Sequence, residues 1–427
     1  MTPSGERPAP RILASPPTWR EQRSREESGS VQIGPVEFFE APNSSHQEHL
    51  VEIFGTCDER FTPVRDAFAA NFKNGLEVGA SVAVTVDGKP VVDLWGGEAI
   101  QGSAAWQEDT IVNVYSTTKT MAATSILVAA DRGLIDFDAP VARYWPEFAQ
   151  NGKAGVLVRH VMSHSAGLSG FDPPIEEISR LYDWDTVVAG LAAQKPWWTP
   201  GEGSGYHAVT QGFLQGEIIR RVTGKSLGTF FREEIAEPLG ADFHIGLDAI
   251  HDPRVGDLVP PGRSLAGAEA DPDSIATRTM KSCNLDGTEP ATPGWRRAEI
   301  PAAGGIGNAR SVARVHAMLA CGGELDGIRL LREDTLACIL REQTSGTDKV
   351  LGVPIRFGMG FGLIDENFPL SPNERAFFWG GWGGSIAVID LDARVSIAYV
   401  MNRMEANLMG DVRGGSLVLT AFGCLDG

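Results

Sequence analysis

The 427-residue sequence lacks the marks of several protein classes. Its five cysteines are odd in number and far apart, with no C-x-x-C pair, which argues against a disulfide scaffold and a structural zinc site. Its apolar runs, such as residues 121–130, fall short of the roughly 18 residues that a membrane span needs. The N-terminus lacks the charged-then-apolar pattern of a signal peptide. We therefore expect a protein of a reducing compartment, the cytoplasm, outside the membrane.

Lysine is also scarce, because only eight of the 37 basic residues are lysines. The formal net charge is -18, and no basic stripe interrupts the acidic sequence. Such a surface repels phosphate, which disfavours nucleic acid and anionic membranes as partners. The sequence is otherwise ordinary, with 42% hydrophobic and 22% charged residues, and is long enough to bury a large core.

The order of the expected elements predicts an α+β fold. Residues 1–46 are rich in proline, serine and charge, and we expect a flexible tail there. Residues 251–300 are irregular, which suggests a long surface excursion. The expected strands are 81–85, 91–95, 357–364, 385–390 and 395–401, with hairpin turns at 86–89 and 391–394. The expected helices are 116–131, 211–222, 227–236 and 417–422.

Strands near both ends and helices between them indicate one domain over 47–427. An antiparallel sheet completed by both ends of the chain would form one lobe, at about 47–118 and 300–427. The inserted helices would form the other lobe, at about 119–299.

The strongest chemical signal is Ser116 followed by Lys119. At the start of a helix, residues three apart share one face, so the lysine amine lies within reach of the serine hydroxyl. A lysine with a lowered pKa can activate such a serine, and the N–H groups of a helix start favour an oxyanion. A capping serine beside a solvated lysine is the alternative. This S-x-x-K is the only one in the chain, and the helix after it is apolar nearly all round, which favours a buried lysine.

Two later segments could complete such a site. Tyr206 lies in a loop before an expected helix, and its phenol could move a proton or be a buried structural tyrosine; we interpret His207 as structural. Residues 379–385 read Trp-Gly-Gly-Trp-Gly-Gly-Ser and are expected to open a strand. Glycines there allow a close backbone approach to a ligand or another strand, or form a β-bulge.

These three segments, in this order, resemble the serine β-lactamase and penicillin-binding-protein superfamily over about residues 49–427. The resemblance extends to the β-lactamase-like carboxylesterases, esterase family VIII, and includes the segments 109–119, 159–168 and 304–311. It implies an α/β sandwich with a central antiparallel sheet flanked by terminal helices, and no metal or cofactor. The resemblance implies that Ser116 is the acylated nucleophile, that Lys119 is its partner base and that Tyr206 shares in proton transfer. It also implies an oxyanion hole formed by the backbone N–H groups of Ser116 and Trp382. His164 and Asp138 lie in family motifs that we interpret as structural. Whether Lys119 or Tyr206 takes the serine proton stays open.

Departures from the family pattern bear on the substrate. Ala208 stands where β-lactamases carry an asparagine that holds an amide substrate, and Trp379, Gly380 and Gly381 stand in place of Lys-Thr-Gly. Two polar anchors are thereby lost, which favours small uncharged esters with short or medium acyl groups. Trp198 could add to an apolar pocket. The alternatives are acyl transfer from the same acyl-enzyme, weak β-lactam or amide hydrolysis, and a catalytically silent binding protein; the oligomeric state stays open.

Overall fold

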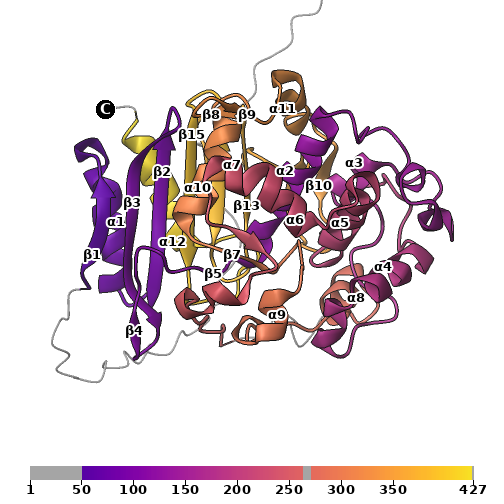
Figure 1. Ribbon diagram of the computed structural model, residues 1–427, viewed down its shortest axis with the longest axis horizontal. Coiled ribbons are helices and arrows are strands. Elements are labelled where there is room, and N and C mark those ends of the chain that lie inside the picture. The colour runs from indigo at the N-terminus through magenta and orange to yellow at the C-terminus, as the bar shows by residue number, and fades with distance from the viewer. Residues whose placement is uncertain (1–50, 263–270, 426–427) are drawn as a thin grey trace, which may run out of the picture. The chain divides into compact units, whose positions relative to one another are not determined.

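An antiparallel sheet forms the centre of the molecule in the computed structural model, which describes residues 51–262 and 271–425 (Figure 1). The expected tail at 1–46 lies outside the described residues. The strand order is β1-β3-β2-β15-β14-β13-β12-β11-β10, with β4 paired to β3. The strands of this sheet are β1 Ile53–Cys57, β2 Gly79–Val86, β3 Lys89–Ile100, β4 Ala104–Ala105, β10 Thr344–Thr347, β11 Pro354–Phe357, β12 Gly362–Leu363, β13 Ala376–Gly380, β14 Ile386–Asp390 and β15 Val395–Met401.

Strands from the two ends of the described chain lie side by side in this sheet. β2 pairs with β15 from Ala80↔Met401 to Val86↔Val395, as the sequence predicted. The two expected hairpins are also present, since β2 turns into β3 at Val86↔Lys89 and β14 turns into β15 at Asp390↔Val395. The α+β fold with a sheet completed by both ends is therefore confirmed.

Helices cover both faces of the sheet. Alternate residues of a strand point to opposite faces. On β15, the Ser396 hydroxyl donates to the carbonyl oxygen of Ala313 in the helix α10 (Ala309–Ala320), at 2.7 Å. Tyr399 points to the other face, where its ring contacts Gly414 of the helix α12 (Val412–Gly423). Helix α1 (Thr62–Lys73) packs against α12 on that side.

The remaining helices form a lobe beside the sheet, at the right of Figure 1. The α-helices of the described residues, including the three that cover the sheet, are α1 Thr62–Lys73, α2 Thr118–Asp131, α3 Val158–Met162, α4 Trp184–Ala193, α5 Thr210–Thr223, α6 Leu227–Phe231, α7 Glu237–Leu239, α8 Ile275–Lys281, α9 Pro293–Arg297, α10 Ala309–Ala320, α11 Glu333–Ile339 and α12 Val412–Gly423. The structure also contains two small sheets. One has three strands in the order β5-β7-β6, and these strands are β5 Val112–Asn113, β6 His244–Ile245 and β7 Gly305–Gly307. The other is a hairpin of β8 Glu324–Leu325 and β9 Ile328–Arg329.

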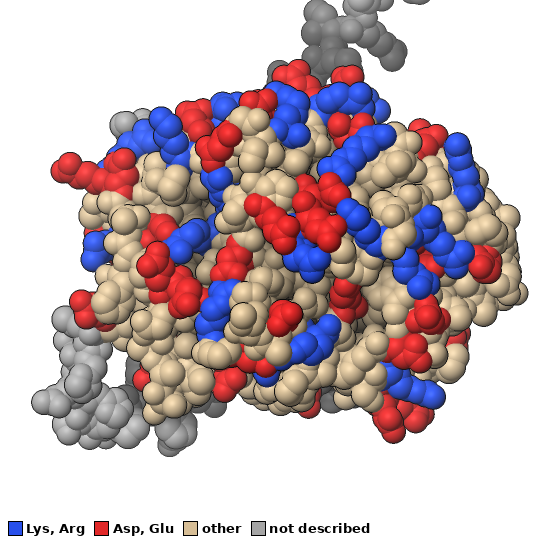
Figure 2. Space-filling model, in the orientation of Figure 1, with Lys and Arg blue, Asp and Glu red and all other residues tan. Residues whose placement is uncertain are grey.

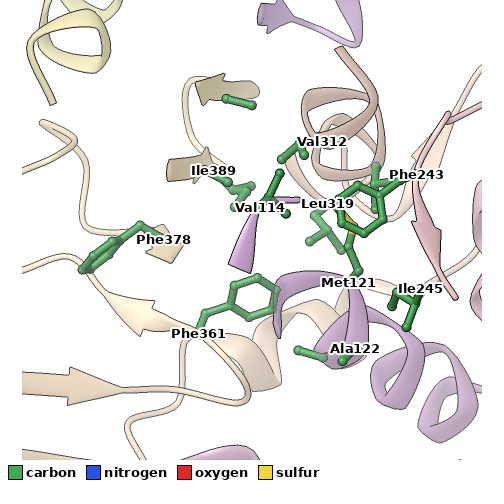
Figure 3. Packing of buried hydrophobic residues seen from close by; sticks show 14 of the residues in the cluster. Val114, Met121, Ala122, Phe243, Ile245, Val312, Leu319, Phe361, Phe378 and Ile389 are labelled. Carbon is green, nitrogen blue, oxygen red and sulfur yellow. The ribbon is translucent and has the colours of Figure 1, made fainter. Parts of the chain in front are cut away.

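Helix α2 lies in the middle of the core. Every residue from Thr118 to Ala129 is buried, which confirms that this helix is covered all round. Figure 3 shows Met121 and Ala122 of α2 among apolar side chains such as Phe361, from the turn between β11 and β12, and Leu319, from α10. A polar side chain at the start of this helix is therefore held in a dry, closely packed setting.

Four expectations about the elements were wrong in detail. Residues 357–364 form two short strands instead of one, because Gly360 has φ +89° and a side chain on Gly358 would meet the carbonyl of Ile339 at 1.9 Å. Residues 379–380 end the strand β13 instead of opening one. The helix expected at 227–236 continues as a π-turn and α7 up to Leu239. Residues 251–300 contain α8, α9 and the fully buried Trp295, so this region is only partly a surface excursion.

The surface mixes both signs of charge. Figure 2 shows acidic and basic side chains interspersed on the face that it draws. None of the described helices is long and apolar enough to cross a bilayer.

Candidate active site

Three predicted residues from two distant parts of the chain lie together around the Ser116 hydroxyl. Ser116 lies in a short 3-10 helix, Tyr115–Thr117, directly before α2, and Lys119 lies in the first turn of α2. Tyr206 comes from the loop before α5. The Ser116 Oγ lies 3.0 Å from the Lys119 Nζ and 2.5 Å from the Tyr206 Oη. The structure thus brings together the three side chains that the sequence singled out.

The setting of Lys119 favours an uncharged amine. The residue is only 2% exposed, and burial lowers the pKa of its amine well below the ordinary value of 10.5. Its Nζ donates to the carbonyl oxygens of Ala208, at 2.7 Å, and Ala302, at 2.9 Å. A neutral amine has two protons and one lone pair, so these carbonyls occupy both protons. The lone pair is left to accept a proton from Ser116.

The setting of Tyr206 favours the opposite state, a protonated phenol. The side chain is fully buried, and burial raises its pKa above the ordinary value of 10.0. The phenol therefore keeps its proton and donates it to the Ser116 oxygen. The backbone N–H of Tyr206 donates to Asp348 Oδ1 at 2.9 Å, and the same oxygen accepts from the N–H groups of Val350 and Leu351. Asp348 thus fixes the position of the tyrosine, and no local motif in the sequence pointed to it.

Two buried histidines support this tyrosine without bringing charge. The ring of His164 lies 5.0 Å from that of Tyr206, and its Nδ1 accepts the backbone N–H of His207 at 3.0 Å. The His207 Nε2 accepts the N–H of Leu168 at 3.1 Å, so its Nδ1 carries the proton and donates to the Gly205 oxygen. Burial lowers the pKa of His207 to about 3 and that of His164 well below 6.5. Both rings are neutral, in agreement with structural roles.

Asp138, the other residue interpreted as structural, lies away from this cluster and pairs at the surface with Arg159, at 2.5 Å.

The glycine-rich turn between β13 and β14 packs directly against the segment that carries Ser116. The Ser385 hydroxyl lies 2.9 Å from both the Val114 carbonyl and the Thr117 hydroxyl. A side chain on Gly381 would meet the Val114 oxygen at 2.2 Å, so only glycine allows this approach. Within residues 51–262 and 271–425, the backbone N–H groups of Ser116 and Trp382 donate no hydrogen bond. Both are available to an oxyanion, as a hydrolytic site requires.

A cavity of about 50 Å³ opens beside Ser116, and its lining carries no formal charge. No described residue in this lining is Asp, Glu, Lys, Arg or His. The lining residues are Tyr115, Ser116, Ser169, Gly170, Phe171, Tyr206, Ala208, Val209, Thr210, Thr279, Met280, Ser282, Cys283, Asn284, Leu285, Ala303, Trp382 and Leu408. The sequence singled out no residue in the loop 169–171 or in the segment 279–285, which is the end of α8 and the loop after it. No motif marks these residues, and their place depends on long-range packing.

Four residues predicted to bind substrate are not among the residues that line this cavity. Trp379 is buried in β13, with its ring 5.3 Å from that of Tyr206. Gly380 contacts the backbone of Met409, and Gly381 that of Val114. Trp198 packs over Gly205 and His207. Of the predicted substrate-binding residues, Ala208 reaches the cavity directly.

The chain resembles proteins already known. The family model described as Beta-lactamase matches residues 68–421. Esterase/beta-lactamase LipL of Mycobacterium tuberculosis is 39% identical over 372 residues, 84% of each chain. Among solved structures, a family VIII carboxylesterase is 46% identical, with a TM-score of 0.82 over 87% of this chain and 100% of its own. A penicillin-binding-protein homologue from Caulobacter crescentus is 41% identical, with the same TM-score and the same shares of the two chains. This chain therefore belongs to the β-lactamase family and is a carboxylesterase-type hydrolase.

Proposed function

We propose that the protein hydrolyses small uncharged carboxylic esters through an acyl intermediate on Ser116. One observation carries this proposal: the Ser116 oxygen lies 3.0 Å from the buried Lys119 amine and 2.5 Å from the buried Tyr206 phenol, at the edge of an uncharged cavity. A hydroxyl becomes a nucleophile when a base takes its proton, and the amine is the group with a free lone pair. We therefore assign the base to Lys119.

The acylation step follows from these positions. The Lys119 amine takes the Ser116 proton while the serine oxygen attacks the ester carbonyl carbon. The carbonyl oxygen becomes an oxyanion that accepts from the N–H groups of Ser116 and Trp382. When the intermediate collapses, the bond to the alcohol oxygen breaks. Tyr206 gives this oxygen its proton, and the Lys119 ammonium, 4.7 Å from the centroid of the tyrosine ring, restores the proton of the phenol.

Deacylation repeats the sequence with water. Water gives one proton to Lys119 and its oxygen attacks the acyl carbon, and the serine oxygen then leaves and is protonated again by Tyr206. The products are one carboxylic acid and one alcohol, and the site returns to its starting protonation. An alcohol or amine in place of water would give acyl transfer, which is the alternative outcome of the same intermediate.

The uncharged lining of the cavity supports the proposed substrate class. A charged substrate group would lose its water there without meeting an opposite charge, at a cost of several kcal/mol per ion. β-Lactams carry a carboxylate, so the uncharged lining disfavours them relative to neutral esters. A small cavity also disfavours long acyl chains, because apolar contacts are lost once the chain extends past the walls.

A panel of p-nitrophenyl esters of increasing chain length, with nitrocefin beside it, tests the proposal. We expect the highest kcat/KM for short and medium acyl groups, a decline for long ones, and much slower turnover of nitrocefin. Ser116→Ala is expected to abolish ester turnover and to keep the fold, as judged by circular dichroism. Undiminished turnover by this variant would contradict the acyl-serine mechanism, and faster turnover of nitrocefin than of esters would contradict the substrate class. Added alcohols would reveal acyl transfer as new ester products.

A further inference from the structure

A fully buried arginine lies behind the turn that carries Trp382. Arg413 stands at the start of α12, and its side chain is 1% exposed. Its Nη2 donates to the carbonyl oxygen of Gly383 at 2.7 Å. Gly383 directly follows Trp382 in the turn between β13 and β14. A charged group thus binds the backbone of this turn without being part of the cavity lining.

The guanidinium is held rigidly by further partners. Its Nε and Nη2 donate to the carboxylate of Asp411, at 3.0 Å and 2.5 Å. Its Nη1 lies 3.1 Å from Glu77 Oε2 and donates to the carbonyl of Arg403 at 2.9 Å. The Tyr399 hydroxyl donates to the other oxygen of Glu77. All three nitrogens of the guanidinium are therefore engaged, as a planar fork of donors allows.

The turn has little freedom to move relative to this cluster. Gly384 has φ +131°, and a side chain there would meet Asp411 Oδ2 at 2.4 Å and Arg413 Nη2 at 2.5 Å. The Gly383 oxygen also accepts from the N–H of Glu405 at 3.0 Å. The same turn also contacts the Ser116 segment, because the Ser385 hydroxyl lies 2.9 Å from both the Val114 carbonyl oxygen and the Thr117 hydroxyl. The turn is thus fixed between the Ser116 segment and the charged cluster, with Trp382 in between.

A buried charged cluster needs a reason beyond stability. Burying these groups costs desolvation energy, and apolar residues of similar shape often stabilise a fold as well or better. Orienting a backbone donor is a task that a rigid charged fork performs and an apolar side chain does not. An oxyanion hole depends on such orientation, because its donors must face the charge that develops in the transition state.

We propose that Arg413 is a positioning residue for catalysis: through the Gly383 carbonyl it orients the turn so that the Trp382 N–H faces the oxyanion. This inference rests on the proposed function, since it requires an oxyanion at that place. Arg413 touches no substrate. Its loss should therefore weaken binding of the transition state and leave binding of the ground-state ester nearly unchanged.

Arg413→Lys tests the proposal, because a lysine keeps the charge but cannot bind Gly383, Asp411 and Glu77 together. We expect kcat for a p-nitrophenyl ester to fall by about tenfold or more, less than the 100- to 1,000-fold for a lost oxyanion donor, with KM within about twofold. The affinity for an uncharged trifluoromethyl ketone, which binds serine as a tetrahedral adduct, should fall by the same factor as kcat/KM.

Tyr399→Phe is the matched control. It removes only the hydroxyl, which bonds Glu77, and keeps the ring that packs beside Arg413 and Gly414. This variant should therefore lower stability and keep kcat within about twofold of the wild type. If Arg413→Lys does not fold, Asp411→Asn weakens the same support more gently and should change kcat and ketone affinity in the same direction. A folded variant of either kind with wild-type kcat and ketone affinity would overturn the inference. The proposed function would still stand in that case, provided that Ser116→Ala is inactive; an active Ser116→Ala would overturn the function itself.

Discussion

Replacing Lys119 by methionine separates its chemical role from its structural role. Methionine keeps most of the side-chain length and removes the amine. The carbonyls of Ala208 and Ala302 then lose their donor inside the protein. Each unsatisfied buried acceptor costs about 1–3 kcal/mol, so Lys119→Met should lower the free energy of unfolding by about 2–6 kcal/mol.

The catalytic loss is expected to be separate and large. A general base contributes about 100- to 10,000-fold to the rate, which is roughly 3–5 kcal/mol in the barrier. We therefore expect kcat/KM for p-nitrophenyl butyrate to fall at least about 100-fold in Lys119→Met.

The pH profile of the wild type adds a second check. Lys119 must be neutral to act as a base, so activity is lost as the pH falls through its pKa. Because burial lowers that pKa well below 10.5, the acid limb should lie well below this pH.

The chain offers a matched control in Lys153. This lysine is also buried, and its amine donates to two carbonyls, those of Gln150 and Gln194. Lys153→Met should cost a similar amount of stability in urea unfolding and keep kcat/KM within about threefold of the wild type. The assignment of the base would be refuted if Lys119→Met kept more than about one tenth of the wild-type kcat/KM while remaining folded.

Two further predictions concern the core and the glycine-rich turn. His316 in α10 is buried with no hydrogen-bond partner for its ring among the described residues, and burial lowers its pKa to about 3. Below about pH 6.5, the histidine is therefore protonated in the unfolded state but stays neutral in the folded state. The free energy of unfolding then falls by up to about 1.4 kcal/mol for each pH unit between pH 6.5 and about pH 3. His316→Leu should reduce this loss, as urea titrations at several pH values would show; an unchanged pH dependence would contradict it. Gly381→Ala should lower kcat by about tenfold or more, because the new Cβ would lie 2.2 Å from the Val114 oxygen and would push the turn away from Ser116. Gly415→Ala is the control, because its Cβ would have open space around it, and this variant should keep kcat unchanged. Equal kcat values for the two variants would contradict this explanation.

The parts of the site that depend on nearby residues were predictable from the sequence. The spacing of Ser116 and Lys119 sets their distance through helix geometry, and the apolar helix after them predicted the burial of the amine. The turns at 86–89 and 391–394 join strands adjacent in sequence, so local patterns identified both hairpins.

The rest depends on contacts between distant segments. Phe171 and Cys283 reach the cavity from loops that carry no local signal. Arg413 binds the backbone of Gly383, and Asp348 binds the backbone of Tyr206, both far away in sequence. A single arginine or aspartate forms no sequence motif that would predict such a contact. Trp379 was expected at the substrate; its ring packs 5.3 Å from that of Tyr206, and it is not among the residues that line the cavity. One strand was expected over 357–364, but the positive φ of Gly360 and the close approach of Gly358 to the Ile339 carbonyl divide it by a turn.

The most direct test of the account is to trap the acyl-enzyme. A fluorophosphonate probe or an acid-quenched p-nitrophenyl ester reaction, followed by intact-mass measurement and peptide mapping, would locate the covalent group. The account predicts one adduct per chain, on Ser116, that disappears in Ser116→Ala and forms much more slowly in Lys119→Met. Turnover without any adduct on Ser116, or an adduct on another residue, would contradict it.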